Sequence, residues 1–137
     1  MWTYEHSVNT SASPETVWKI FTDVPGWTSW NAGIEQVSIT GPFAQGTVFH
    51  MQPGGQPMLT CRLVHVQENA YFEDETILGD ICVLVGHRVQ RLNDCLSKIT
   101  YSVKVTGPDA EHVGPAITED FPQVMQALLV FAQRSQP

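Results

Sequence analysis

Residues 96–106, LSKITYSVKVT, alternate apolar and polar side chains more cleanly than any other part of the chain. A two-residue period is typical of a β-strand that buries one face and exposes the other. One face of this predicted strand carries Ile99, Tyr101, Val103 and Val105, and the other carries lysine, serine and threonine. Tyr101 is therefore expected to point into the core, where its hydroxyl needs a hydrogen-bond partner.

From residue 117 onward the apolar period becomes helical. Apolar residues then recur at spacings of three and four, namely Phe121, Val124, Met125, Leu128, Leu129 and Ala132. Pro122 lies inside this segment, so either the helix begins near Asp120 or an earlier turn is kinked at the proline. The Gly-Pro pairs at 107–108 and 114–115 predict a connecting loop between the strand and this long helix.

Strand patterns also precede residue 96. They cover residues 34–40, 46–52, 58–67, 71–78 and 81–92, and short turn-forming stretches separate them. Residues 2–8 form a further alternating strand. Between the first strand and the others, Ser13 is a predicted N-cap for a helix to about residue 21, and a second short helix or turn carries Trp27 and Trp30.

These segments predict one α+β domain over residues 1–137. The strands form a curved seven-stranded antiparallel sheet, two short helices follow the first strand, and a long C-terminal helix covers the sheet. Because twist accumulates across seven strands and one helix is only about 10 Å wide, we expect a cavity between the sheet and this helix.

The composition excludes several classes of partner. The chain carries 14 acidic and seven basic residues, for a net charge of −7, and the basic residues are scattered singly. Nucleic-acid binding needs a concentrated basic face, so nucleic acid is not an expected partner. The start of the chain shows no signal sequence and no apolar run, which favours a cytoplasmic protein without integral membrane association. A monomer and a homodimer remain equally open.

The N-terminal half of the chain resembles a known signature. The matching residues are 13–21, SPETVWKIF, with Asp23, Trp27 and Trp30, and further matches follow in order at Gly41-Pro42-Phe43, Gly46, His87, residues 105–108 and the helix over 122–132. This pattern resembles the START-like (SRPBCC) superfamily, and within it the polyketide cyclase/dehydrase and lipid-transport branch, whose wider family includes birch-pollen-allergen-like proteins. The resemblance implies the helix-grip fold and a cavity for a hydrophobic small molecule. It implies no shared catalytic residues.

The histidines give the first candidates for chemistry. His6, His50, His65, His87 and His112 lie on different segments, and no two have the spacing of a metal site, so no metal or other cofactor is expected. His87 lies between Val85 and Val89 in a strand and is a candidate polar anchor or general base, although a core or surface role is the commoner one.

The orientation of the charged residues in the strands stays open. Arg62 and Asp74 would make a polar pair if both faced the cavity, but alternation with Cys61 and Leu63 favours a solvent-facing Arg62. Arg88 is equally undecided. The run 73–75, Glu-Asp-Glu, favours solvated carboxylates on the convex face or an edge.

Three functions follow as hypotheses. The leading one is binding of a small hydrophobic or aromatic ligand in the cavity. The expected wall is Trp30, Phe43, Phe49, His87, Tyr101, Phe121, Met125 and Leu128. The second is a polyketide cyclase or dehydratase that uses His87 and Tyr101 for acid–base catalysis. The third is a non-catalytic, stress-related or co-chaperone-like interaction module.

Overall fold

The computed structural model describes residues 1–136 and contains one seven-stranded antiparallel sheet. The strands are β1 (Trp2–Thr10), β2 (Ile34–Ile39), β3 (Val48–Pro53), β4 (Leu59–Gln67), β5 (Tyr71–Leu78), β6 (Ile81–Asn93) and β7 (Leu96–Thr106). Their order across the sheet is β1-β7-β6-β5-β4-β3-β2. Neighbours from β2 to β7 are consecutive in sequence because short turns join them, and β1 closes the far side against β7.

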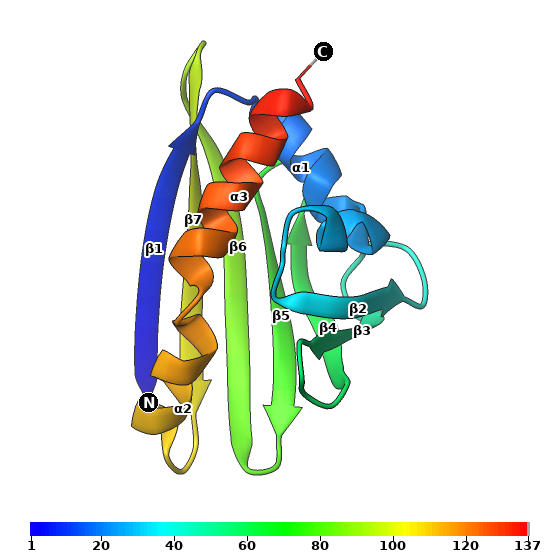
Figure 1. Cartoon of the computed structure of the whole chain (residues 1–137), viewed down its shortest axis with the longest axis vertical. Helices are drawn as coiled ribbons and strands as arrows, with labels where there is room; N and C mark the ends of the chain where they lie inside the picture. Colours follow the sequence, from blue (N-terminus) through cyan, green and yellow to red (C-terminus); the bar gives the residue numbers. More distant parts are fainter. Residues whose placement is uncertain (137) are drawn as a thin grey trace.

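The helices lie on one side of this sheet. They are α1 (Pro14–Thr22), the 3-10 helix η1 (Val24–Ser29), α2 (Ala110–Thr118) and α3 (Phe121–Arg134). Figure 1 shows α3 running obliquely across the sheet, with α1 beside its C-terminal end and α2 beside its N-terminal end. The predicted α+β fold, with its curved sheet, short helices after β1 and long C-terminal helix, is confirmed.

The start of α3 resolves the ambiguity at Pro122. The helix begins at Phe121, with Asp120 at its N-cap and the proline in the first turn. In the first turn an amide hydrogen has no partner inside the helix, so proline is tolerated there. Of the two alternatives, the helix that begins near Asp120 is confirmed.

The connecting loop predicted over residues 107–115 is wrong in its second half. The chain forms α2 from Ala110 to Thr118, which packs against β1 and β7. Gly114 was taken as a loop residue, but it is buried and lies against the indole ring of Trp2, where a Cβ atom would overlap the ring. The glycine therefore serves close packing of the helix, and turn formation is left to Gly107, whose φ is 114°.

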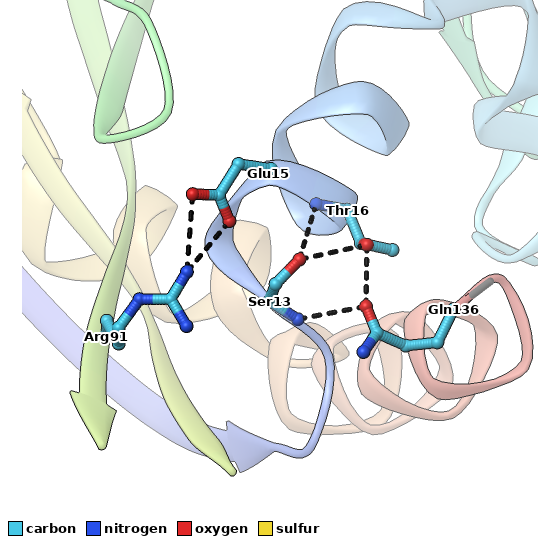
Figure 2. A network of polar contacts seen from close by, with 5 residues as sticks. All are labelled: Ser13, Glu15, Thr16, Arg91 and Gln136. Atoms are coloured by element: carbon cyan, nitrogen blue, oxygen red, sulfur yellow. Dashed lines mark hydrogen bonds and ion pairs between the residues drawn. The ribbon is translucent and has the colours of Figure 1, made fainter. Parts of the chain in front are cut away.

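Polar side chains fasten the ends of α1 and α3 together (Figure 2). The Ser13 hydroxyl accepts a hydrogen bond from the Thr16 backbone amide, which confirms the predicted N-cap. The Gln136 side-chain oxygen accepts hydrogen bonds from the Ser13 backbone amide and the Thr16 hydroxyl, at 3.1 and 2.6 Å. Arg91 pairs with Glu15 at 3.0 Å and thereby connects β6 to α1. These contacts fix the C-terminal end of α3 over the sheet.

Candidate functional site

The inner face of the sheet carries a row of ring side chains across neighbouring strands. His87 on β6 lies opposite Phe72 on β5 and opposite Tyr101 on β7. Alternation puts all three side chains on the face that α3 covers, and each is at most 9% exposed. The expectation that Tyr101 points into the core is confirmed, and of the orientations left open for His87 the inward one is correct.

Aromatic contacts hold the His87 imidazole on both sides. Its ring stacks on Phe72 with centroids 3.9 Å apart and planes 6° apart. The Tyr101 ring meets it edge-on at 4.5 Å, and Phe21 from α1 contacts it at 6.0 Å. These contacts fix the plane of the imidazole ring in the interior.

Asp74 supplies a carboxyl beside this imidazole. It lies two residues beyond Phe72 on β5, diagonally across from His87, and its Oδ2 atom is 3.7 Å from His87 Nδ1. The same nitrogen is 3.4 Å from the Phe72 carbonyl oxygen. The side chains of Asp74 and His87 are only 12% and 11% exposed. An acid and a base are therefore close together in a largely apolar interior.

Burial changes the protonation of both groups. Removal from water raises the pKa of Asp74 to about 8, and the nearby Glu73 carboxylate adds to the shift. Removal from water also lowers the pKa of His87 to about 3, against a smaller opposing effect of the Phe72 carbonyl. At neutral pH the Asp74 carboxyl is then largely protonated and the His87 imidazole is neutral. Burial and the Asp74 charge raise the pKa of Tyr101, so its hydroxyl also keeps its proton.

The polar row continues from Asp74 toward β4. Thr76 on β5 lies opposite Cys61 on β4, and its hydroxyl is 3.2 Å from the thiol sulfur. Burial and the Asp74 charge raise the pKa of Cys61 to about 12. This thiol stays protonated at neutral pH, so it is a packing residue and not a nucleophile.

The placement predicted for Asp74 is wrong. Residues 73–75 were expected to present solvated carboxylates, yet Asp74 is 8% exposed and faces inward. Arg62 is exposed, as its alternation favoured, so an Arg62–Asp74 pair inside the sheet does not form. Arg88 is also exposed and lies over the Tyr71 ring at 4.5 Å. The alternation of β5 could have placed Asp74 correctly. Residues two apart in a strand share a face, so Asp74 lies on the same face as the apolar Phe72.

The side chains predicted to line the cavity lie in or against the buried core. Phe121 contacts Tyr101 edge-on at 5.8 Å, so α3 closes over the polar row. Phe43 contacts Phe72 at 5.0 Å. Phe49, Met125 and Leu128 are at most 1% exposed. Trp30 is 9% exposed but lies apart, where α1, η1 and α3 meet. Contact of these residues with a ligand stays a prediction. Sequence reasoning did not name Phe72, and it considered Asp74 for the cavity but favoured a solvated position for it.

Within residues 1–136, no three histidine, cysteine, aspartate or glutamate side chains gather in a way that could hold a metal ion. None of the helices in this part of the chain is long and apolar enough to cross a membrane. The cytoplasmic location stays a prediction.

A family model described as polyketide cyclase / dehydrase and lipid transport matches residues 1–130. The chain belongs to this family. No match was found among functionally curated proteins.

Solved structures confirm that the family fold is present. The Zhui aromatase/cyclase from Streptomyces sp. R1128 is 18% identical, with a TM-score of 0.79 over 97% of this chain and 94% of that one. The allergen Ara h 8.0201 is 16% identical, with a TM-score of 0.75 over 96% and 97% of the two chains. A START superfamily protein from Mycobacterium smegmatis is 14% identical, with a TM-score of 0.73 over 93% and 96%. At these identities the likeness concerns the fold.

The raised pKa of Asp74 and the lowered pKa of His87 predict a specific pH dependence of the free energy of unfolding. Asp74 binds its proton more tightly in the folded state, so it lowers the free energy of unfolding as pH rises from about 3.9 to about 8. His87 binds its proton less tightly in the folded state and has the opposite effect between about 3 and 6.5. The two effects oppose each other at lower pH, and Asp74 acts alone between about pH 6.5 and 8. Relative to the D74N variant, the wild-type protein should lose up to about 2 kcal/mol across that window.

Urea unfolding of both proteins at closely spaced pH values measures this difference. Subtraction of the two curves removes the contribution of every other titrating group. Parallel curves between pH 6.5 and 8.5 would contradict a raised pKa for Asp74.

Proposed function

We propose that this protein binds a small hydrophobic or aromatic molecule that carries a carbonyl or hydroxyl group, between the inner face of the sheet and α3. The observation that carries the proposal is the polar group of Asp74, His87 and Tyr101 within an aromatic interior. A buried carboxyl that makes no strong hydrogen bond costs stability, and such a cost persists where function requires it.

The protonated Asp74 carboxyl suits a neutral ligand. It has one O–H to donate and oxygens that accept, so it can bind a ketone or an alcohol without an ion pair. The Tyr101 hydroxyl and the free His87 nitrogen offer a second polar contact. The rings of Phe72, Phe43 and Phe121 would contact the apolar part of the ligand, in keeping with small-molecule sites that combine apolar walls with few polar groups.

Access to this site requires α3 to move. Met125 and Leu128 are 0% exposed and cover the polar row, so a ligand must displace them. The chain is not helical between Thr118, where α2 ends, and Phe121, where α3 begins. A break next to Pro122 gives α3 a pivot at one end, while the Gln136 contacts hold the other (Figures 1 and 2). The flexible methionine side chain can repack around different ligands.

A pair of probes that differ by one hydroxyl tests this proposal. We expect 2-naphthol to bind saturably with one site per chain, and naphthalene to bind about two- to tenfold more weakly, because it lacks the hydrogen bond to Asp74. The D74L variant should abolish the difference between the probes. Titration followed by the fluorescence of the naphthalene ring measures both affinities.

The matched control is E75L, which removes the adjacent carboxylate on the opposite face of β5. It should leave both affinities unchanged. Absence of saturable binding by either probe, or equal effects of D74L and E75L, would overturn the proposal.

A second candidate function is acid–base catalysis at the same site, in line with the cyclase and dehydrase membership of the family. It is favoured by one specific observation: a protonated carboxyl and a neutral imidazole lie 3.7 Å apart. The imidazole could take a proton from the carbon beside a carbonyl while the carboxyl protonates an oxygen. The carbanion attacks the second carbonyl carbon, whose oxygen takes the carboxyl proton, so a ring closes as an aldol. The imidazolium then returns its proton to the Asp74 carboxylate. In a second round the imidazole removes another proton from the same carbon while the carboxyl protonates the hydroxyl, so the C–O bond breaks and water leaves.

Conversion of heptane-2,6-dione to 3-methylcyclohex-2-enone and water measures this activity through the absorbance of the enone. H87F and D74N should each lower the rate at least tenfold, and the wild-type rate should fall above about pH 8, as Asp74 loses its proton. E75Q is the control. A rate equal to that without protein, or one that H87F leaves unchanged, would eliminate the enzymatic candidate.

A further inference from the structure

A hollow lies outside the sheet, where α1, η1 and α3 meet. Its volume is about 280 Å³, near the lower end of the range for small-molecule sites. Its lining includes Thr16, Lys19, Ile20, Asp23, Trp30 and Phe131. None of its lining residues belongs to a β-strand, so this groove is separate from the polar row on the sheet.

The floor of the groove is apolar and contains a free donor. Ile20 and Trp30 are 8% and 9% exposed and belong to the buried core, and Phe131 packs against it. Within residues 1–136, Trp30 Nε1 is the one fully enclosed side-chain nitrogen or oxygen without a hydrogen-bond partner. By contrast, Trp27 Nε1 donates to the Phe21 carbonyl at 3.1 Å. This nitrogen is enclosed, so its N–H resonance can report a change in the groove floor without contact to a ligand.

The rim carries one charge of each sign. Lys19 lies in the last turn of α1 and Asp23 directly follows the helix, and both are exposed. Neither makes an ion pair with another described residue. Asp23 is held elsewhere: its carboxylate lies against Gly26 of η1, where a Cβ atom would overlap it. The missing side chain at Gly26 therefore leaves room for the carboxylate over η1, where it makes no ion pair with Lys19.

The Thr16 hydroxyl, at one part of the groove, is already engaged. It donates to the Gln136 side-chain oxygen at 2.6 Å, and this contact ties α1 to the residues after α3 (Figure 2). The polar group of a ligand would therefore lie toward Lys19 and Asp23, and its apolar group toward Ile20 and Phe131.

We propose that this groove binds a small zwitterion with an apolar side chain, of about the size of phenylalanine. The ligand carboxylate pairs with Lys19 and its ammonium group pairs with Asp23. An anion alone would lie beside the Asp23 carboxylate, and a cation alone would leave Lys19 unpaired. The protein already has a net charge of −7, which further disfavours an anion.

Titration of the ¹⁵N-labelled protein with L-phenylalanine tests the proposal, with the Trp30 indole N–H resonance, assigned through W30F, as the reporter. Saturable movement of this resonance is expected. 2-Phenylethylamine and 3-phenylpropionate each lack one charge and should bind about two- to fivefold more weakly, the range for exposed ion pairs. K19M and D23N should weaken phenylalanine binding by a similar factor.

The matched controls are K98M on β7 and D94N in the turn before it, and neither should change the affinity. An unmoved Trp30 resonance, equal binding by all three probes, or equal binding by K19M and the wild type would each overturn the proposal. Movement confined to signals of His87 and Tyr101 would also overturn it, because it would assign the ligand to the interior instead. Failure of this test leaves the naphthol experiment unaffected, since none of the residues proposed to bind naphthol lines this groove.

Discussion

Packing of α3 against the inner face of the sheet is the contact on which the other features of this structure depend. Met125, Leu128 and Ala132, spaced along one stripe of the helix, are 0% exposed. The strands beneath contribute the rings of Phe72, His87 and Tyr101, which also form contacts with one another. Phe21 of α1 contacts His87 and Phe121 of α3 contacts Tyr101, so the two helices together exclude water from this face. Each polar group there loses hydration and must find a protein or ligand partner.

The chemistry of Asp74 and His87 follows from that exclusion of water. Near the surface, a carboxylate and an imidazole 3.7 Å apart would favour an ion pair at neutral pH. In the interior, desolvation is the largest effect on both groups, so the pKa of Asp74 rises and that of His87 falls. The result is a neutral pair that can donate and accept hydrogen bonds. Such a pair suits a neutral oxygen-bearing ligand better than an ion.

The fold could be predicted from the sequence because its elements have strong local signals. Alternation over residues 96–106 and the stripe of Phe121, Met125 and Leu128 each depend on one period, and the structure keeps both. The helix α2 was missed because its decisive contact is tertiary. Gly114 has no side chain, and this lets α2 pack closely against the ring of Trp2. Local rules assign a glycine beside a proline to a loop, and only the packed structure reverses that preference.

The site was predicted less completely for a related reason. His87 and Tyr101 were found because each is a polar residue within an apolar alternating strand. Asp74 was assigned to the wrong face because its neighbours Glu73 and Glu75 made the segment resemble a solvated acidic run. Glu73 and Glu75 lie on the outer face, whereas Asp74 between them lies on the inner face, and the run of three acidic residues does not show this difference. The pairing of Asp74 with His87 also depends on the register of β5 and β6, which composition does not encode.

A direct titration of the Asp74 side chain tests the central claim, that burial beneath α1 and α3 keeps a protonated carboxyl beside a neutral imidazole. The ¹³C resonance of this carboxyl, assigned through D74N and followed from pH 3 to 10, reports its pKa without reference to unfolding. We predict a midpoint near the pKa of about 8 that burial gives Asp74, and no imidazole titration of His87 between pH 5 and 8. A carboxyl midpoint near 4 together with an imidazole midpoint near 6.5, the values of the free side chains, would contradict the account.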